Sequence, residues 1–181
     1  MIDIRRFRGR RRLTVVGLVA TAGVLLAGTA LAESPAAAAA HKEALVPGTP
    51  CTVSAKSCVD LDSQRAWLFS GGTILRGPVP VATGGDGQAT PVGHSLRVYR
   101  KDANHKSQES RLPNGAPAPM PNSVFFEDGG IAFHSGSPSR SSAGCVHLNP
   151  DDAKAWFDYL QIGDKVQVVS AKAEMAARGG H

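Results

Sequence analysis

Apolar and polar residues alternate over short stretches of this chain, and a period of two predicts half-buried β-strands. The alternation is clear at 58–62 and again at 94–99, where Leu96 and Val98 share one face. Glycines and prolines separate the stretches, and Gly71-Gly72 has the composition of a two-residue hairpin turn. The predicted strands are 58–62, 65–69, 73–75, 79–83, 94–99, 123–126, 131–133 and 165–169.

One helix is predicted after residue 149. Asn149 has the side chain of an N-cap, Pro150 fits the first helical position, and the two aspartates that follow suit the positive end of the helix dipole. Apolar residues then recur at helical spacing and predict a stripe that packs on the core. They are Ala153, Trp156, Phe157 and Leu160. The helix is expected to end before Gly163.

The segment from Lys101 to Asn122 is polar and rich in proline, and it is predicted to be a long loop. Loops of this length are usually functional or disordered. With the strands and the single clear helix, the chain is expected to form one mainly β domain with one or two helices.

The first 32 residues have the composition of an export signal. Six arginines between Arg5 and Arg12 precede an apolar run at 13–32, which ends in the small-residue sequence Ala30-Leu31-Ala32. This order predicts a cleaved secretory signal peptide. The alternative is an uncut membrane tether through residues 13–32, because a run of 20 residues is long enough to span a bilayer.

The net charge of +5 belongs to this leader. Residues 33–181 contain 14 basic and 14 acidic side chains, so the remainder of the chain is neutral. A neutral domain has no basic field that would attract phosphates, and nucleic acid is therefore not expected as a partner.

Composition divides the rest of the chain into three parts. Residues 33–50 contain five consecutive alanines and three prolines and are expected to be a linker. Residues 51–171 are long enough for one domain with one core. Residues 172–181 are expected to be a flexible tail.

The three cysteines fall into a close pair and a single residue. Export implies an oxidising compartment, and a disulfide can close the short loop between Cys51 and Cys58. Cys145 is left over, and an unpaired cysteine in a secreted protein indicates a reactive thiol or an intermolecular bridge. Its neighbours Gly144 and His147 favour a reactive thiol over a buried filler.

A cysteine nucleophile needs a base and donors for the oxyanion. His134 ends the apolar strand 131–133, where a rigid element would present its imidazole, and it is the expected base. His147 would share a face with Cys145 in an extended chain and is the second candidate. The N–H groups of Gly144 and Cys145 are the expected oxyanion donors.

A zinc site is the alternative use of these residues. His134, Cys145, His147 and one aspartate of the helix are all possible zinc ligands. Their spacing matches no closed structural zinc pattern, and the chain has no His-Glu-x-x-His sequence. No metal or cofactor is therefore expected.

The ordered motifs of the chain resemble the catalytic domain of the L,D-transpeptidases, the YkuD-type cysteine enzymes of bacterial cell walls. The resemblance runs from Val59 to Val169. The motifs that carry it are Val81-x-Thr83-Gly84 with Thr90-Pro91-Val92-Gly93, Ile131-Ala132-Phe133-His134-Ser135-Gly136, Ser142-Ala143-Gly144-Cys145 and Gly163-Asp164-Lys165-Val166.

The resemblance implies a YkuD-like fold of β-sandwich or barrel type, with Cys145 as nucleophile and His134 as general base and acid. It also implies that Ser142 and Gly144 shape the nucleophile loop, and that Ser135 lies where a backbone or hydroxyl group orients the imidazole. His147 stands where many members have Arg or Asn, which leaves recognition of the substrate carboxylate open.

The expected function is peptidoglycan L,D-transpeptidation. Cys145 would accept an acyl group from a tetrapeptide stem, release D-Ala, and pass the acyl group to an amine of a second stem, giving a 3-3 cross-link. The resemblance also implies acylation by carbapenems. Three alternatives remain: an L,D-carboxypeptidase or cross-link hydrolase at the same site, a non-catalytic wall-binding domain with Cys145 in an intermolecular disulfide, and a papain-like protease. The expected location is the bacterial cell wall or the secreted fraction, with a possible membrane anchor.

Overall fold

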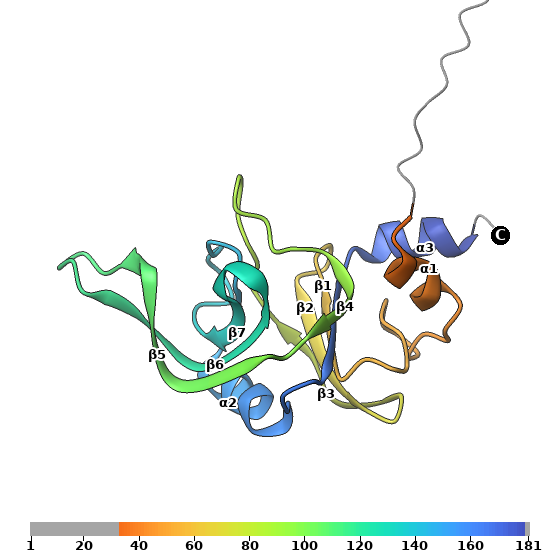
Figure 1. Ribbon diagram of the computed structural model, residues 1–181, viewed down its shortest axis with the longest axis horizontal. Coiled ribbons are helices and arrows are strands. Elements are labelled where there is room, and N and C mark those ends of the chain that lie inside the picture. The colour runs from red at the N-terminus through yellow and green to blue at the C-terminus, as the bar shows by residue number, and fades with distance from the viewer. Residues whose placement is uncertain (1–32, 180–181) are drawn as a thin grey trace, which may run out of the picture. The chain divides into compact units, whose positions relative to one another are not determined.

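A computed structural model describes residues 33–179, and the expected signal or anchor at 1–32 lies outside them. The fold is mainly β and has two sheets and three α-helices (Figure 1). The fold class predicted from the sequence is confirmed, although it was expected to have only one or two helices. No helix among the described residues is long and apolar enough to cross a membrane.

The first sheet has five strands in the order β3-β2-β1-β9-β4. The parallel pair β1 and β9 lies at its centre, and the other pairings are antiparallel. Its strands are β1 (Ser57–Asp60), β2 (Arg65–Ser70), β3 (Thr73–Pro80), β4 (Gly93–Arg97) and β9 (Lys165–Val169). Gly71 and Gly72 join β2 to β3 with φ angles of 55° and 77°, the left-handed conformation that the predicted two-residue turn requires.

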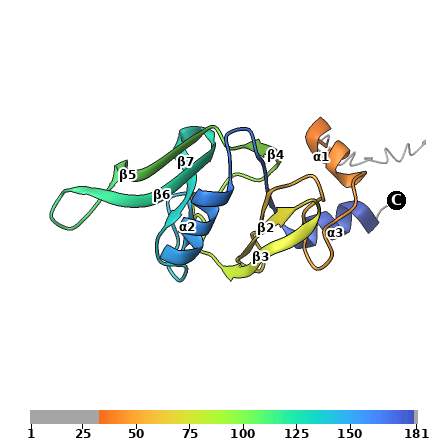
Figure 2. The ribbon, with the colours of Figure 1, turned by 90° about the horizontal axis from the view of Figure 1, so that it is seen from below.

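The second sheet has four strands in the order β5-β6-β7-β8. They are β5 (Arg100–Arg111), β6 (Pro117–Glu127), β7 (Ile131–Ser135) and β8 (Val146–Leu148), and the short 3₁₀ turn η1 (Asp128–Gly130) precedes β7. β5 and β6 form a long hairpin that projects from the body of the fold (Figures 1 and 2).

This hairpin replaces the long loop predicted at 101–122, and that prediction was wrong. Pro117, Pro119 and Pro121 alternate along β6, so they fall on the same side of the strand. This half of β6 pairs with β5 alone, because β6 meets β7 only from Val124 onward. A strand with one free edge tolerates prolines, since their missing N–H groups can face away from the partner.

Helix α2 (Pro150–Tyr159) holds the two sheets together. Asn149 caps it and Pro150 occupies its first turn, as predicted. α2 packs against β6, β7 and β8, and its Trp156 is fully buried. The Trp156 indole N–H donates to Ser57 Oγ of β1 at 2.9 Å, so one side chain reaches from the second sheet to the first.

Two further helices lie at the ends of the described chain. α1 (Pro35–His41) occupies part of the expected linker, and α3 (Ala171–Gly179) occupies the expected tail. Ser34 caps α1, Pro35 fills its first turn and alanine has the highest helix propensity, so the run of alanines forms a helix. The guanidinium of Arg178 in α3 donates to the carbonyls of Ala40, His41 and Glu43, and these bonds join the two helices.

Cys51 and Cys58 form a disulfide at the start of β1. Both cysteines are fully buried, and they pack with Val46, Trp67, Phe69 and Val169 in a small core of their own. The main core lies between the sheets and α2, with Trp156 at its centre.

We expect Trp156→Ala to lower the free energy of unfolding by about 3–5 kcal/mol, because it opens a large cavity and leaves Ser57 without its donor. Urea denaturation followed by circular dichroism measures the effect. Ile162→Ala is the matched control, because Ile162 is 62% exposed and its truncation should change stability by less than about 0.5 kcal/mol. Similar losses for both variants would contradict the central role of Trp156.

Candidate active site

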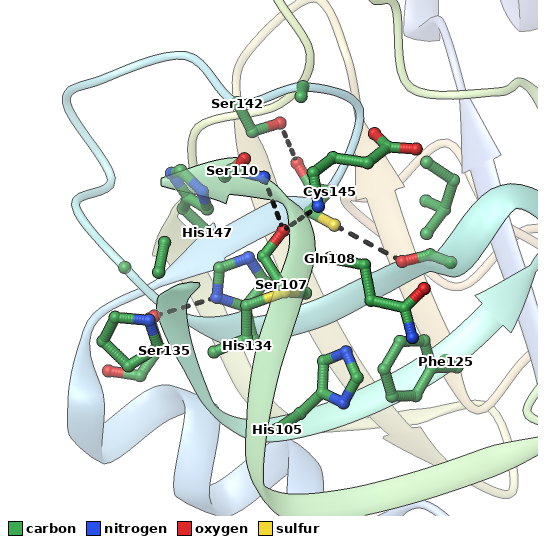
Figure 3. A pocket seen from close by; sticks show the side chains of 18 of the residues that line it. His105, Ser107, Gln108, Ser110, Phe125, His134, Ser135, Ser142, Cys145 and His147 are labelled. Atoms are coloured by element: carbon green, nitrogen blue, oxygen red, sulfur yellow. Dashed lines mark hydrogen bonds between the residues drawn. The ribbon is translucent and has the colours of Figure 1, made fainter. Parts of the chain in front are cut away.

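The parallel pairing of β7 with β8 brings the predicted histidine and cysteine together. Phe133 pairs with Val146 and His134 with His147, so Cys145, just before β8, lies beside β7. Both His134 and Cys145 line one cavity of about 660 Å³. Figure 3 shows both side chains facing this cavity, with β5 passing in front of them.

The β5–β6 hairpin supplies much of the cavity wall, which the sequence analysis missed. His105, Ser107 and Glu109 come from β5, and Met120 and Phe125 come from β6. Arg140 and Ser141 of the loop before Cys145 also line the cavity. The polar, proline-rich composition of 101–122 suggested a functional loop, but it contained no signal for the register that aims these side chains at Cys145.

Cys145 is the only free cysteine of the chain. Its thiol donates to the carbonyl of Gly130 at 3.7 Å. Burial raises the pKa of the thiol above its ordinary value of 9.0, a hydrogen bond with the backbone of Ala132 lowers it in part, and the carboxylate of Glu109 raises it. The resting sulfur is therefore a protonated thiol at neutral pH.

His134 is buried, with 6% of its surface exposed. Its Nδ1–H donates to the carbonyl of Ser135 at 2.9 Å, and because a carbonyl only accepts, the neutral ring keeps its lone pair on Nε2. Burial is the main cause that lowers the pKa of His134 to about 4; the hydrogen bond to the Ser135 carbonyl raises the pKa in part, and the neighbouring His147 lowers it. The imidazole is therefore a neutral base at physiological pH.

No hydrogen bond joins Cys145 to His134 within the described residues 33–179. The resting site thus contains a neutral thiol and a neutral imidazole in one cavity, rather than a thiolate–imidazolium pair. Such a pair performs general-base catalysis, in which the proton leaves sulfur as the sulfur attacks.

His147 lies against the ring of His134. The two ring centroids are 4.8 Å apart with an interplanar angle of 74°, an edge-to-face contact. The Nδ1–H of His147 donates to the carbonyl of Arg140 at 3.1 Å, and burial lowers its pKa. Gly136 makes room for this ring, since a Cβ there would lie 2.8 Å from His147 Cγ. His147 therefore fixes one side of His134.

A network of hydrogen bonds shapes the turn that carries Cys145. Ser142 Oγ donates to the carbonyl of Cys145 and accepts from the N–H of Gly144 at 3.0 Å. Thr90 Oγ1 donates to the carbonyl of Gly144 at 2.8 Å. The N–H groups of Gly144 and Cys145 were both predicted as oxyanion donors. The N–H of Gly144 already donates to Ser142 Oγ, so the N–H of Cys145 remains as the expected donor.

Gly144 is required by its backbone and by its surroundings. Its φ is +111°, in the region that disfavours side chains, and a Cβ would lie 2.8 Å from Ile131 Cδ1. The contribution of Thr90 was missed by sequence reasoning, although Thr90 stood in one of the motifs that carried the resemblance.

Comparison with known proteins agrees with this geometry. The family model of the YkuD L,D-transpeptidase catalytic domain matches residues 54–168. A curated relative, "Probable L,D-transpeptidase ErfK/SrfK" of Salmonella typhimurium, is 26% identical over an alignment of 141 residues, and the match covers 66% of this chain and 46% of the relative.

Two solved structures illustrate the structural similarity. An L,D-transpeptidase from Stackebrandtia nassauensis is 31% identical with a TM-score of 0.55, covering 63% of this chain and 54% of that one. L,D-transpeptidase 3 of Mycobacterium tuberculosis, solved with a faropenem-derived adduct, is 20% identical with a TM-score of 0.54, covering 62% and 58% of the two chains. At this identity the second structure shows the fold alone. The chain spans about half the length of the first two relatives.

We expect the alkylation rate of native Cys145 by iodoacetamide to rise about tenfold per pH unit up to at least pH 9, because the thiolate reacts and the pKa of the thiol is raised. Intact-protein mass spectrometry counts one added group, since the other two cysteines form a disulfide. Protein unfolded without reductant is the control. Its alkylation rate should level off at a lower pH than that of the native protein, because the unfolded thiol has its ordinary pKa. A plateau of the native rate below pH 8 would contradict the neutral resting pair.

Proposed function

We propose, from the premise that this chain belongs to the YkuD family of L,D-transpeptidase catalytic domains, that it is a cysteine acyltransferase acting on peptidoglycan stem peptides. The observation that carries the proposal is the shared cavity of His134, in β7, and Cys145, which directly precedes the adjacent parallel strand β8. Membership of the family supplies the class of reaction, and the residues of the cavity supply the groups that would perform it.

In the first step, His134 Nε2 takes the proton of Cys145 as Sγ attacks the carbonyl of the third residue of a tetrapeptide stem. The oxyanion accepts a hydrogen bond from the Cys145 N–H. When the tetrahedral intermediate collapses, the C–N bond breaks, His134 returns the proton to the amine, and terminal D-Ala leaves. A thioester then joins the stem to Cys145.

In the second step, an amine of another stem attacks the thioester, and His134 takes its proton. Collapse of the second intermediate breaks the C–S bond, His134 returns the proton to Sγ of Cys145, and the new amide is a 3-3 cross-link. Bond making and breaking balance with no oxidant, metal or cofactor, because both steps exchange one acyl acceptor for another.

The surrounding residues have positioning roles in this proposal. The Ser135 carbonyl selects the tautomer that leaves Nε2 of His134 basic. The ring of His147 limits rotation of His134 from the side. Ser142 and Gly144 hold the turn that presents Sγ, and Thr90 fixes that turn from the neighbouring loop.

We propose the same nucleophile for β-lactams of the penem and carbapenem classes, because ring opening by a thiolate also yields a thioester. The support is a solved relative that carries a faropenem-derived adduct. We further propose that residues 1–32 act as a signal peptide or anchor, that 33–50 connect this leader to the catalytic domain at 51–171, and that the domain works outside the cytoplasm at the cell wall.

The placement of Cys145 favours an enzyme over a domain that uses this cysteine for an intermolecular bridge. Its half-buried sulfur lies in a cavity that it shares with His134 and that residues of the hairpin strand β5 line, rather than on an open surface (Figure 3). A hydrolase or carboxypeptidase at the same site differs only in the acceptor, so product analysis separates the two.

We expect Cys145→Ala to form no adduct with faropenem, and His134→Gln to slow adduct formation by about 10²–10⁴-fold, because the neutral base is lost. Intact-protein mass spectrometry over time measures both. Lys154→Gln changes an exposed side chain of α2 and is the control, with an unchanged rate. Adduct formation by Cys145→Ala at the rate of the unchanged protein would remove Cys145 from the mechanism.

We expect incubation with a disaccharide-tetrapeptide to release D-Ala and to yield a cross-linked dimer, detected by liquid chromatography and mass spectrometry. Adding a free D-amino acid should divert the thioester into an exchange product, since an amine acceptor outcompetes water. Tripeptide as the sole product, with or without the amine, would instead identify a carboxypeptidase. No turnover combined with a dimer on non-reducing gels would support the intermolecular bridge.

A further inference from the structure

A second cluster of reactive side chains lies where α1 meets α3, away from β7 and β8 (Figure 1). His41 comes from α1, His94 from β4 and Glu174 from α3. One ligand atom of each lies within 4.8 Å of the others. These residues are far apart in the chain, and two of them fall in segments that composition marked as linker and tail.

The cluster is removed from solvent. The side chains of His41, His94 and Glu174 are 10%, 12% and 5% exposed. A buried carboxylate is costly unless it is paired, and its partners here are His94 Nε2 at 2.5 Å and Arg178 Nε at 3.5 Å. Within the described residues, His41 Nε2 and Arg178 Nε are the two buried side-chain atoms that lack a hydrogen bond, and both face Glu174.

The other side of the His41 ring indicates which of its nitrogens is free to bind a cation. Nδ1 of His41 pairs with the carboxylate of Glu33, so in the neutral ring Nδ1 carries the hydrogen and Nε2 carries a lone pair. That lone pair lies 3.3 Å from Glu174 Oε2, which is also an acceptor. Two buried acceptors at this distance repel unless a proton or a metal ion lies between them, and a metal titration separates these two cases.

The charge of the cluster points the same way. Glu33 and Glu174 contribute two negative charges, and Arg178 contributes one positive charge. The terminal nitrogens of Arg178 are used on the backbone carbonyls of Ala40, His41 and Glu43. With neutral imidazoles the cluster therefore carries one net negative charge, which attracts a cation.

We propose that His41 Nε2, His94 Nε2 and the Glu174 carboxylate bind a divalent transition metal of the zinc class. Two imidazoles and one carboxylate form a three-ligand set of zinc, whereas calcium and magnesium prefer oxygen alone. Ligands of tetrahedral zinc lie about 3.4 Å apart, so the present separations require side-chain shifts of about 1 Å. Glu33 then serves as the carboxylate that orients a metal-bound histidine.

The metal would connect three distant parts of the chain. Gln167 of β9 donates to the backbone carbonyl of His94 at 3.0 Å and so fixes the strand that carries this ligand. Binding only to the folded state stabilises that state, and it would hold α1 and α3 on the first sheet. The site shares no residue with the cavity of Cys145, so it does not depend on the proposed function.

The test is a titration of the metal-stripped full chain with Zn²⁺ alone, followed by calorimetry, and with Co²⁺ alone, followed by visible absorption. We expect one equivalent to bind, with the intense visible bands of tetrahedral cobalt. Zn²⁺ at 100 times its Kd should raise Tm by roughly 5–10 °C. His41→Gln and His94→Gln should each weaken binding at least tenfold and abolish the cobalt bands.

Two controls keep the outcome clear. His134→Gln should leave the cobalt spectrum and the stoichiometry unchanged, because His134 lies in the cavity of Cys145 and is not one of the proposed metal ligands. Circular dichroism and one-to-one acylation by faropenem confirm that His41→Gln and His94→Gln are folded. If faropenem acylates neither the variants nor the unchanged protein, the proposed function fails. Circular dichroism then reports folding by itself, and the metal titration still tests the metal site.

Three results would overturn the proposal. The first is the absence of saturable binding at stoichiometric Zn²⁺ or Co²⁺. The second is unchanged binding by folded His41→Gln and His94→Gln. The third is loss of binding in His134→Gln, which would assign the metal to the cavity of Cys145 instead.

Discussion

The structure depends on the parallel pairing of two short strands, β7 and β8. Parallel neighbours need a crossover, and such connections usually contain a helix. Here the connection between Ser135 and Val146 has no helix, and it ends in the turn that presents Cys145. A short crossover leaves little conformational freedom, which is why that turn requires Gly144 at positive φ, the bridging hydroxyl of Ser142 and the anchor from Thr90. The placement of Cys145, the proposed nucleophile, is thus a product of sheet topology, and α2 secures the topology by packing on the same strands.

Burial determines the protonation states of Cys145 and His134 in the resting cavity. Desolvation disfavours both charged forms, so the thiolate and the imidazolium are each suppressed in the resting cavity. The carboxylate of Glu109 on the hairpin adds to this on the side of the thiol. A cysteine that stays protonated until a carbonyl arrives is less exposed to oxidation, because the thiolate is the form that oxidants attack. This is a useful property of a sulfur in the extracytoplasmic setting proposed above, where disulfides form readily.

Sequence reasoning succeeded where a local signal decides the structure. Asn149 with Pro150 specifies a helix start, Gly71 with Gly72 specifies a hairpin turn, and the residues around Cys145 are distinctive in order and spacing.

Sequence reasoning failed where pairing across the chain overrides local composition. The alternating prolines of β6 look like a loop until β5 is known to lie on one side only. The alanines after Ser34 look like a linker until Arg178 is known to bind the carbonyls at the end of their helix. The grouping of His41, His94 and Glu174 has no sequence spacing at all, because it arises from three separate elements.

The hairpin of β5 and β6 allows the wall of the cavity to change independently of the packed sheets and helix that hold Cys145 and His134 in place. Its outer half is bonded only to itself, so changes there alter neither the sheet nor α2. The same outer half, with Ser107, Glu109 and Met120, forms a wall of the cavity that contains Cys145. Natural variation along this arm can therefore remodel the entrance while the chemical centre is inherited intact, and related chains can diverge in what they admit without having to evolve a new catalyst.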